Sequence, residues 1–133
     1  MSPTTTESAV TFEAPDDLEA INRLYRERRW SDGLPIVPPT PERVERMLRQ
    51  TSRGRYEVVA RVAPGYGVAT VERLAINAVL AGCDPEYLPV LIAATEAVAE
   101  PQFNLQGVQT TTNPAAVLIV LNGPIVQHLD VNA

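Results

Sequence analysis

The chain has one cysteine, Cys83, and this residue is the first candidate for chemistry. It lies between Gly82 and Asp84, at the junction of two expected helices. Exposed backbone N–H groups at a helix N-terminus lower the pKa of a nearby thiol, and the thiolate is the reactive form. The position therefore predicts a nucleophilic thiol or a ligand. The alternative is a small buried apolar side chain, and Asp84 would oppose ionisation if it faced the sulfur.

His128 is the only histidine and is the candidate general base for Cys83. Catalytic Cys–His pairs depend on proximity in space rather than in sequence, so the long separation along the chain does not exclude a dyad. The cysteine, histidine and acidic residues show none of the spacings typical of zinc sites. The sequence therefore leaves the metal and any other cofactor unknown, and a site completed by another chain would escape this test.

A long uncharged tract near the C-terminus supplies neutral polar groups. Between Glu100 and Asp130 there is no Asp, Glu, Lys or Arg. Surface segments normally carry charge, so the tract predicts a covered core strand with its loops, an interface with another chain, or the lining of a substrate site. Amide and hydroxyl groups suit an uncharged or weakly polar ligand. The candidate substrate-binding residues of this tract are Asn104, Gln109, Thr111 and Asn113.

Tyr66 is the fifth candidate for substrate binding, and it lies in the glycine-bracketed run "PGYG". We expect this run to lead from a strand into a helix N-terminus, where free backbone amides could hold an anion. A tight structural turn explains the same residues. The Gly-x-Gly motif is too short for a dinucleotide-binding fingerprint.

The elements that must position these residues are four helices and two strands. Helical periodicity with matching caps predicts helices from about residue 16 to near 30, from 41 to about 50, and between a cap at 70 and a stop at 82. A fourth helix is expected over 85–100, in which Pro89 either kinks the first turn or delays the start until about residue 88. Short runs rich in β-branched residues predict strands near 57–63 and 116–122. The sequence thus predicts an α/β fold in one domain, residues 14–133, after a disordered tail, residues 1–13.

A proline-rich strap, residues 31–41, joins the first two expected helices. Its prolines favour an extended backbone without ladder hydrogen bonds, so that little entropy is lost on ordering it. Such a strap could lie across another surface with Trp30 and Leu34 as anchors, or it could pack on its own domain.

Length and charge exclude several classes of protein. With 133 residues the chain fits a single core. A net charge of -5 disfavours nucleic acids and anionic membranes as partners. We find no apolar run long enough to span a bilayer and no secretory signal pattern, and the lone cysteine fits a reducing compartment. These features predict a cytoplasmic protein with protein or small-molecule partners.

Three segments carry a resemblance to a known family: "WSDGLPIVPPTPERVERML", "LAINAVLAGCDPEYLPVLIAATEAV" and "FNLQGVQTTTNPAAVLIVLNGPI". Over roughly residues 28–133 the chain resembles the N-terminal part of a bacterial family of UGSC-type proteins, which is associated with selenoprotein-like thiol-reductase components. The resemblance implies longer chains than this one. It implies architecture rather than a mechanism.

The strand expected near Val117–Leu121 is apolar on both faces and therefore needs cover from both sides. We expect that cover to come from a second protein subunit, or from a C-terminal fragment released by autoprocessing after Ala133. The sequence thus predicts a small subunit, or processed N-terminal fragment, of a heteromeric cytoplasmic enzyme acting on a small organic molecule. Lyase, hydrolase and thiol-dependent redox chemistry all stay open. The alternative is a non-catalytic structural or regulatory subunit that docks through its uncharged C-terminal segment.

Overall fold

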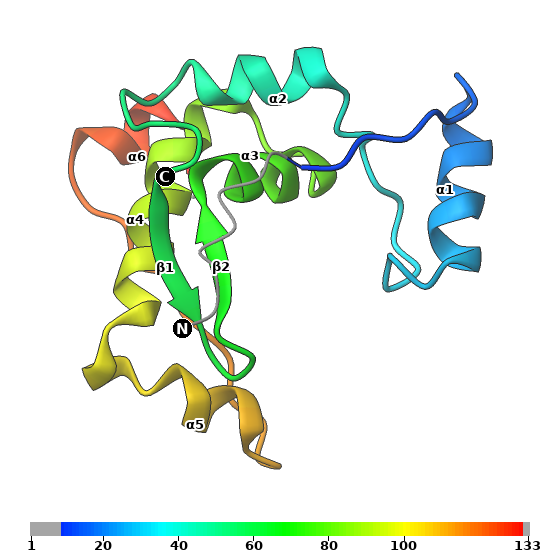
Figure 1. Ribbon diagram of the computed structural model, residues 1–133. Helices are drawn as coiled ribbons and strands as arrows, with labels where there is room; N and C mark the ends of the chain where they lie inside the picture. The colour runs from blue at the N-terminus through cyan, green and yellow to red at the C-terminus, as the bar shows by residue number, and fades with distance from the viewer. Residues whose placement is uncertain (1–8, 132–133) are drawn as a thin grey trace.

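The computed structural model of the protein describes residues 9–131 and combines helices with one small antiparallel sheet (Figure 1). In chain order its elements are α1 (Leu18–Glu27), α2 (Pro41–Leu48), β1 (Val58–Val62), β2 (Gly67–Thr70), α3 (Val71–Leu80), the 3-10 turn η1 (Pro85–Tyr87), α4 (Leu88–Ala99), the 3-10 turn η2 (Pro101–Phe103), α5 (Leu105–Thr110) and α6 (Pro124–His128). The expected α/β class holds in this broad sense. The described part has six α-helices rather than four.

The hydrophobic core lies where α2, α3 and α4 meet, with the β1–β2 hairpin against α4 (Figure 1). Met47, Val71 and Leu88 are its largest fully buried side chains, and they come from three different helices. Each fully buried side chain of this size stabilises the fold by roughly 1.5–3 kcal/mol. The core therefore organises the middle of the chain, residues 41–99, around one centre.

Helix α3 begins and ends where its sequence predicts. The hydroxyl of Thr70 accepts a hydrogen bond from the N–H of Arg73 at 3.3 Å and so caps the first turn. At the other end Gly82 has a φ of 77°, a left-handed conformation that glycine adopts without strain. The N–H groups of Gly82 and Cys83 then donate to the carbonyls of Val79 and Ala78, both at 2.9 Å. This Schellman motif stops the helix immediately before the cysteine.

The proline-rich strap packs on its own chain. The side-chain amide of Asn22, on α1, accepts a hydrogen bond from the N–H of Ile36 at 2.7 Å and donates to the Ile36 carbonyl at 3.4 Å. The next N–H, that of Val37, donates to the carbonyl of Leu80 at 3.2 Å. The strap therefore links α1, which stands to one side of the molecule, to the end of α3 (Figure 1). Leu34 remains exposed.

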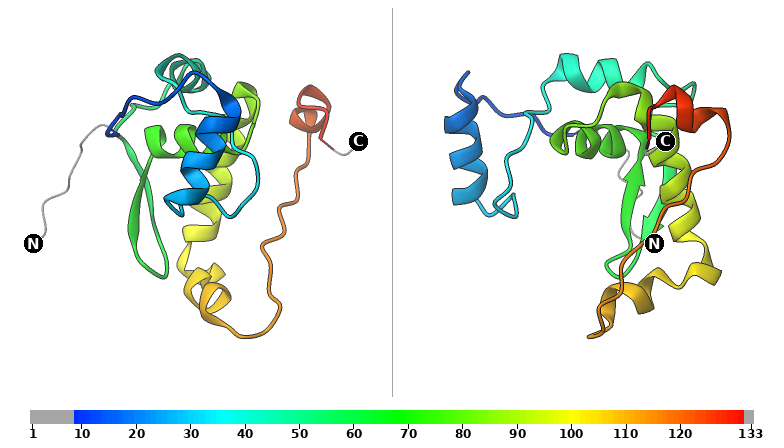
Figure 2. Two further views of the ribbon diagram at one scale, coloured as in Figure 1. Left: turned by 90° about the vertical axis from the view of Figure 1, so that its right-hand side faces the viewer. Right: turned by 180° about the vertical axis from the view of Figure 1, so that it is seen from behind.

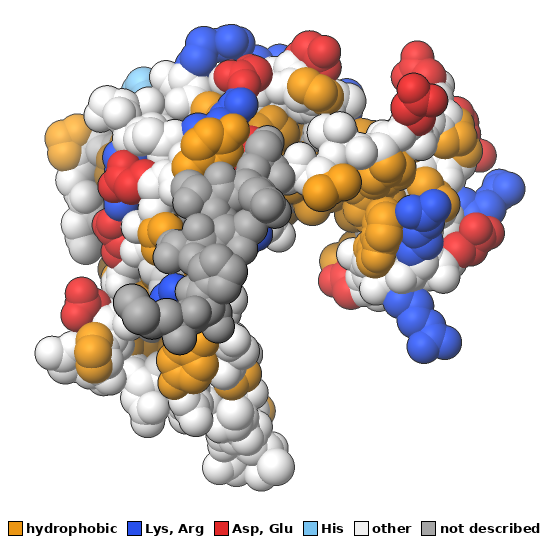
Figure 3. All heavy atoms as spheres, in the orientation of Figure 1, with side chains coloured by type: hydrophobic (Ala, Val, Ile, Leu, Met, Phe, Trp, Pro, Cys, Tyr) orange, Lys and Arg blue, Asp and Glu red, His pale blue; other side chains and the backbone are white. Residues whose placement is uncertain are grey.

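Trp30 packs within the arm formed by α1 and the segment before it. Its ring meets those of Phe12 and Tyr25 edge-on, with centroids 5.6 and 5.5 Å apart, and the Arg28 guanidinium lies 4.8 Å from the Trp30 ring centroid. Figure 3 shows apolar side chains gathered on the side of α1 that faces the body of the molecule, with basic side chains beside them. Half of the Trp30 surface is still exposed.

The segment expected to form a strand near 116–122 is extended, but it pairs with no other strand in the described part of the chain. A strand exists only when a neighbour accepts its backbone hydrogen bonds, and residues 9–131 place none beside it. The sequence analysis also missed β2, which turns the "PGYG" run into a hairpin loop rather than a direct entry to α3. It missed α5 and α6 as well, since each is too short for a periodic pattern.

Most of the expected disordered tail, residues 1–8 of 1–13, lies outside the described residues. Residues 9–13 have no regular secondary structure, but the N–H of Ala9 donates to the Glu72 carboxylate of α3 at 3.1 Å. No helix within residues 9–131 has both the length and the apolar character needed to cross a membrane.

Candidate functional site

Cys83 lies beside a small pocket between α2 and the end of α3. The pocket has a volume of about 170 Å³. Its lining residues are Val37, Arg43, Arg46, Met47, Val79, Gly82, Cys83, Asp84 and Pro85. The thiol is partly buried, so a small molecule in the pocket could reach it.

The environment of Cys83 favours the neutral thiol. Burial, and then the negative charge of Asp84, raise the pKa of the Cys83 thiol above its usual range. The direction of the shift is opposite to the one expected for an activated nucleophile. We therefore expect Cys83 to react as a protonated thiol rather than as a thiolate.

His128 is exposed at the end of α6, and its Nε2 lies 3.7 Å from Oε2 of Glu86 in η1. The hydroxyl of Tyr87 donates to the carbonyl of Leu129 at 3.4 Å, which fastens α6 beside the same turn. Cys83 therefore lies close to η1 in the sequence, and His128 lies close to η1 in space. Within the described residues no hydrogen bond joins them, so their catalytic pairing stays a prediction.

Tyr66 belongs to a second group of residues, at the opposite end of the hairpin. It has a φ of 53° in the β1–β2 loop, and its hydroxyl donates to Oε1 of Gln106 on α5 at 2.5 Å. This bond joins the hairpin loop to the uncharged tract. The sequence analysis missed Gln106, although its place in the run "NLQGVQ" beside the chosen amides was a usable signal.

The other polar residues of the tract support local backbone structure. The side-chain oxygen of Asn104 accepts from the N–H of Gly107 at 3.3 Å and caps α5, while Thr111 accepts from the N–H of Asn113 at 3.2 Å. Gln109 is exposed on α5. None of them lines the Cys83 pocket, so the structure divides the predicted site residues into two groups, one at η1 and one at α5.

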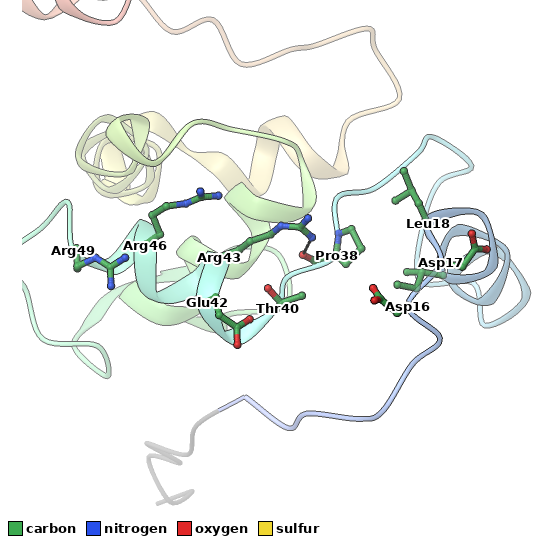
Figure 4. A pocket seen from close by; sticks show the side chains of 10 residues that line it. Asp16, Asp17, Leu18, Pro38, Thr40, Glu42, Arg43, Arg46 and Arg49 are labelled. Atoms are coloured by element: carbon green, nitrogen blue, oxygen red, sulfur yellow. Dashed lines mark hydrogen bonds between the residues drawn. The ribbon is translucent and has the colours of Figure 1, made fainter.

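A larger cleft of about 670 Å³ separates α1 from α2 (Figure 4). One wall comes from α1 and its cap, and the other from the strap and α2. Its lining residues are Asp16, Asp17, Leu18, Ile21, Pro38, Thr40, Glu42, Arg43, Arg46 and Arg49. Arg43 and Arg46 line both this cleft and the Cys83 pocket. These arginines were not predicted as site residues, although their three-residue spacing on a predicted helix indicates that they lie on one side of it.

The segment 116–122 is the most exposed apolar part of the described chain outside the N-terminal arm. Along it the exposed fractions of Val117, Leu118, Ile119 and Val120 are 40%, 83%, 53% and 70%. Its backbone makes no hydrogen bond within residues 9–131. In both views of Figure 2 it runs from α5 to α6 along the outside of the molecule.

Among residues 9–131 no group of three or more His, Cys, Asp or Glu side chains is placed to hold a metal ion. In comparisons with known protein families, with curated proteins and with solved structures, nothing matched the chain. The candidate roles of the site residues therefore depend on their geometry and chemistry alone.

Proposed function

We propose that this chain is a subunit of a heteromeric cytoplasmic assembly and that it contributes residues 116–122 as a β-strand to a different protein. The observation that carries the proposal is the exposure of four consecutive large apolar side chains, Val117 to Val120, on an extended backbone. Contiguous exposed apolar surface of this kind is typical of protein interfaces.

The backbone of the segment supports strand addition rather than packing of side chains alone. An extended chain with unpaired N–H and C=O groups can add to the edge of a sheet, and the main-chain hydrogen bonds then give affinity. Apolar residues point to both sides of the segment, as in a strand that is covered on both faces. The expected partner therefore has an open sheet edge flanked by uncharged, apolar surfaces.

The segment is held at both ends, which lowers the entropic cost of binding. Leu105 anchors α5 and Leu129 anchors α6, and both side chains are buried. The Tyr66–Gln106 and Tyr87–Leu129 hydrogen bonds add to these anchors. A partner would thus bind a segment that is already extended, and preorganisation of this kind increases affinity.

A second copy of this chain fits the segment poorly. The sheet within residues 9–131 has strands of five and four residues, so neither edge matches a seven-residue donor. Two-stranded sheets are also marginal by themselves. The proposal therefore names a different polypeptide as the partner, either a separately encoded subunit or a C-terminal fragment of a longer precursor.

The second candidate function adds catalysis on a small organic molecule to this docking role. The observation that favours it is the access of the Cys83 thiol to a pocket that is also lined by Arg43 and Arg46. In that case His128, or a group from the partner, would act beside η1, in lyase, hydrolase or thiol-dependent redox chemistry. The docking role does not depend on this addition.

Native mass spectrometry and hydrogen exchange of the protein purified from its own cells test the proposal. We expect a complex of fixed ratio with a different polypeptide. Amides 116–122 should exchange at least about a hundredfold more slowly in the complex than in the isolated chain. The Leu118→Asp variant, which places a charge on the exposed face, should remain folded and lose the complex. Val10→Asp, at another exposed apolar residue, is the matched control and should retain it.

The Ile119→Pro variant tests strand pairing itself, because proline removes a backbone donor that has no acceptor within residues 9–131. Loss of the complex supports strand addition. If the complex forms with Ile119→Pro but not with Leu118→Asp, strand addition is wrong and the partner packs against the side chains alone. A lone monomer, a complex of identical chains, or protection confined to other segments would overturn the docking proposal.

A further inference from the structure

We propose that the cleft between α1 and α2 binds a small organic anion, with a carboxylate or phosphate head on the arginines of α2 and an apolar body against α1. The cleft does not contain the 116–122 segment, so this inference is independent of the docking role. Its volume of about 670 Å³ lies within the range of small-molecule sites.

Three guanidinium groups form the basic wall of the cleft. Arg43, Arg46 and Arg49 are spaced three residues apart along α2, so they lie on neighbouring positions of one helix side. Figure 4 shows the Arg43 and Arg46 side chains extending from the same side of the helix. Guanidinium groups bind carboxylate and phosphate with paired, charge-assisted hydrogen bonds.

The guanidinium groups of these arginines have few partners within residues 9–131. Within residues 9–131 the side chains of Arg46 and Arg49 make no hydrogen bond or ion pair, and the side chain of Arg43 donates only to the Pro38 carbonyl, at 2.8 Å. In contrast, Arg53 pairs with two glutamates and Arg55 pairs with Glu45. Three guanidinium groups along one cleft, with no carboxylate paired to them within the described residues, offer a local site for an anion.

The opposite wall explains why the ligand would carry an apolar body. Leu18 is 59% exposed although it opens an amphipathic helix, and it lines the cleft together with Ile21 and Pro38. Contact with an apolar ligand would bury part of the Leu18 side chain, and each Å² of apolar surface buried contributes about 25 cal/mol to the binding free energy. Inorganic phosphate alone would leave this wall uncovered.

Acidic groups in the cleft limit the size of the anion. Asp16, Asp17 and Glu42 also line it, and no ion pair joins them to the arginines within the described residues. Asp17 uses its carboxylate to accept from the N–H of Ala20 at 2.7 Å. The three carboxylates would repel a polyanion such as nucleic acid more strongly than a single small head group.

Isothermal titration of the isolated chain with matched probes tests the site. The probes are phenyl phosphate and benzoate as anions with an apolar body, inorganic phosphate as the head group alone, and phenol as the neutral body. We expect phenyl phosphate or benzoate to bind at least about tenfold more tightly than inorganic phosphate, and phenol not to bind. Equal affinities for phenyl phosphate and phosphate, or no binding of either organic anion at millimolar concentration, would overturn the proposal.

Single substitutions assign the binding to this cleft. Arg46→Gln should weaken binding of the organic anion about tenfold, because it removes one charge-assisted contact. Leu18→Ala should reduce only the preference for the organic anion over phosphate. Arg61→Gln, at an exposed β1 position, removes the same charge elsewhere and should leave the affinity unchanged. Equal weakening by Arg46→Gln and Arg61→Gln would indicate a general charge effect and refute the site. Circular dichroism should show each variant folded.

Discussion

Replacing Leu88 and Leu118 by alanine compares the stability cost at a buried position with the cost at an exposed one. Replacing Leu88 by alanine should lower the free energy of unfolding of the isolated chain by about 3 kcal/mol, within the range measured for buried leucines. The same replacement at Leu118 should lower it by less than about 0.5 kcal/mol.

The exposed fraction of each side chain sets these magnitudes. Leu88 is 0% exposed and lies in the core between α2, α3 and α4, so its truncation removes buried methyl groups and leaves a cavity. Leu118 is 83% exposed, so it contributes only about one-sixth of the roughly 1.5–3 kcal/mol that a fully buried leucine adds to the free energy of unfolding. No cavity can form at a side chain that stands in solvent.

Urea unfolding of the purified isolated chain, followed by circular dichroism, measures both differences. The expected result is a large fall in the midpoint for Leu88→Ala and almost none for Leu118→Ala, at an unchanged slope. A cost above about 2 kcal/mol for Leu118→Ala would show that the chain itself covers the segment. That result would refute the reasoning behind the docking proposal. In the native complex the relative effects should reverse, because Leu118→Ala should reduce assembly with the partner more than Leu88→Ala does.

Three further predictions concern α3 and the residue that follows it. Thr70→Ala should cost about 1 kcal/mol in urea unfolding, whereas Thr40→Ala should cost clearly less, because only Thr70 makes a side-chain cap bond. Gly82→Ala should cost about 1 kcal/mol or more in the same assay, because alanine is strained at a φ of 77°. Alkylation of Cys83 by iodoacetamide should rise with pH with a midpoint above the value of about 8.5 for a free thiol, and Asp84→Asn should lower that midpoint. A midpoint below that of a free thiol would contradict the neutral environment.

The middle of the fold follows from local patterns. The caps at Thr70 and Gly82 define α3 because hydroxyl caps and left-handed glycines act on the backbone beside them. The strand Val58–Val62 was predicted on similar grounds, and the start of α4 at Leu88 is one of the two starts that the sequence left open. Each of these signals operates over a few residues, so the amino-acid order is sufficient to read it.

The candidate site was predictable only in part. Tyr66 and the amide-rich tract do adjoin, through Gln106, whereas Cys83 and His128 make no bond to each other within the described residues. The pKa of a thiol depends on burial and on which charges face it, and burial cannot be read from neighbours in sequence. Of the two interpretations of Cys83, the raised pKa favours the partly buried thiol, with Asp84 opposing ionisation.

The sequence by itself determined roughly where helices α1 to α4 lie, that the strap is extended, and that residues 116–122 form an apolar run. Only the tertiary structure decided that this segment pairs with nothing in the described chain and that the arginines of α2 face a cleft. The physical reason is the range of the interactions. Caps, turns and periodicity act between close neighbours, whereas strand pairing and clefts require segments far apart in the chain to meet.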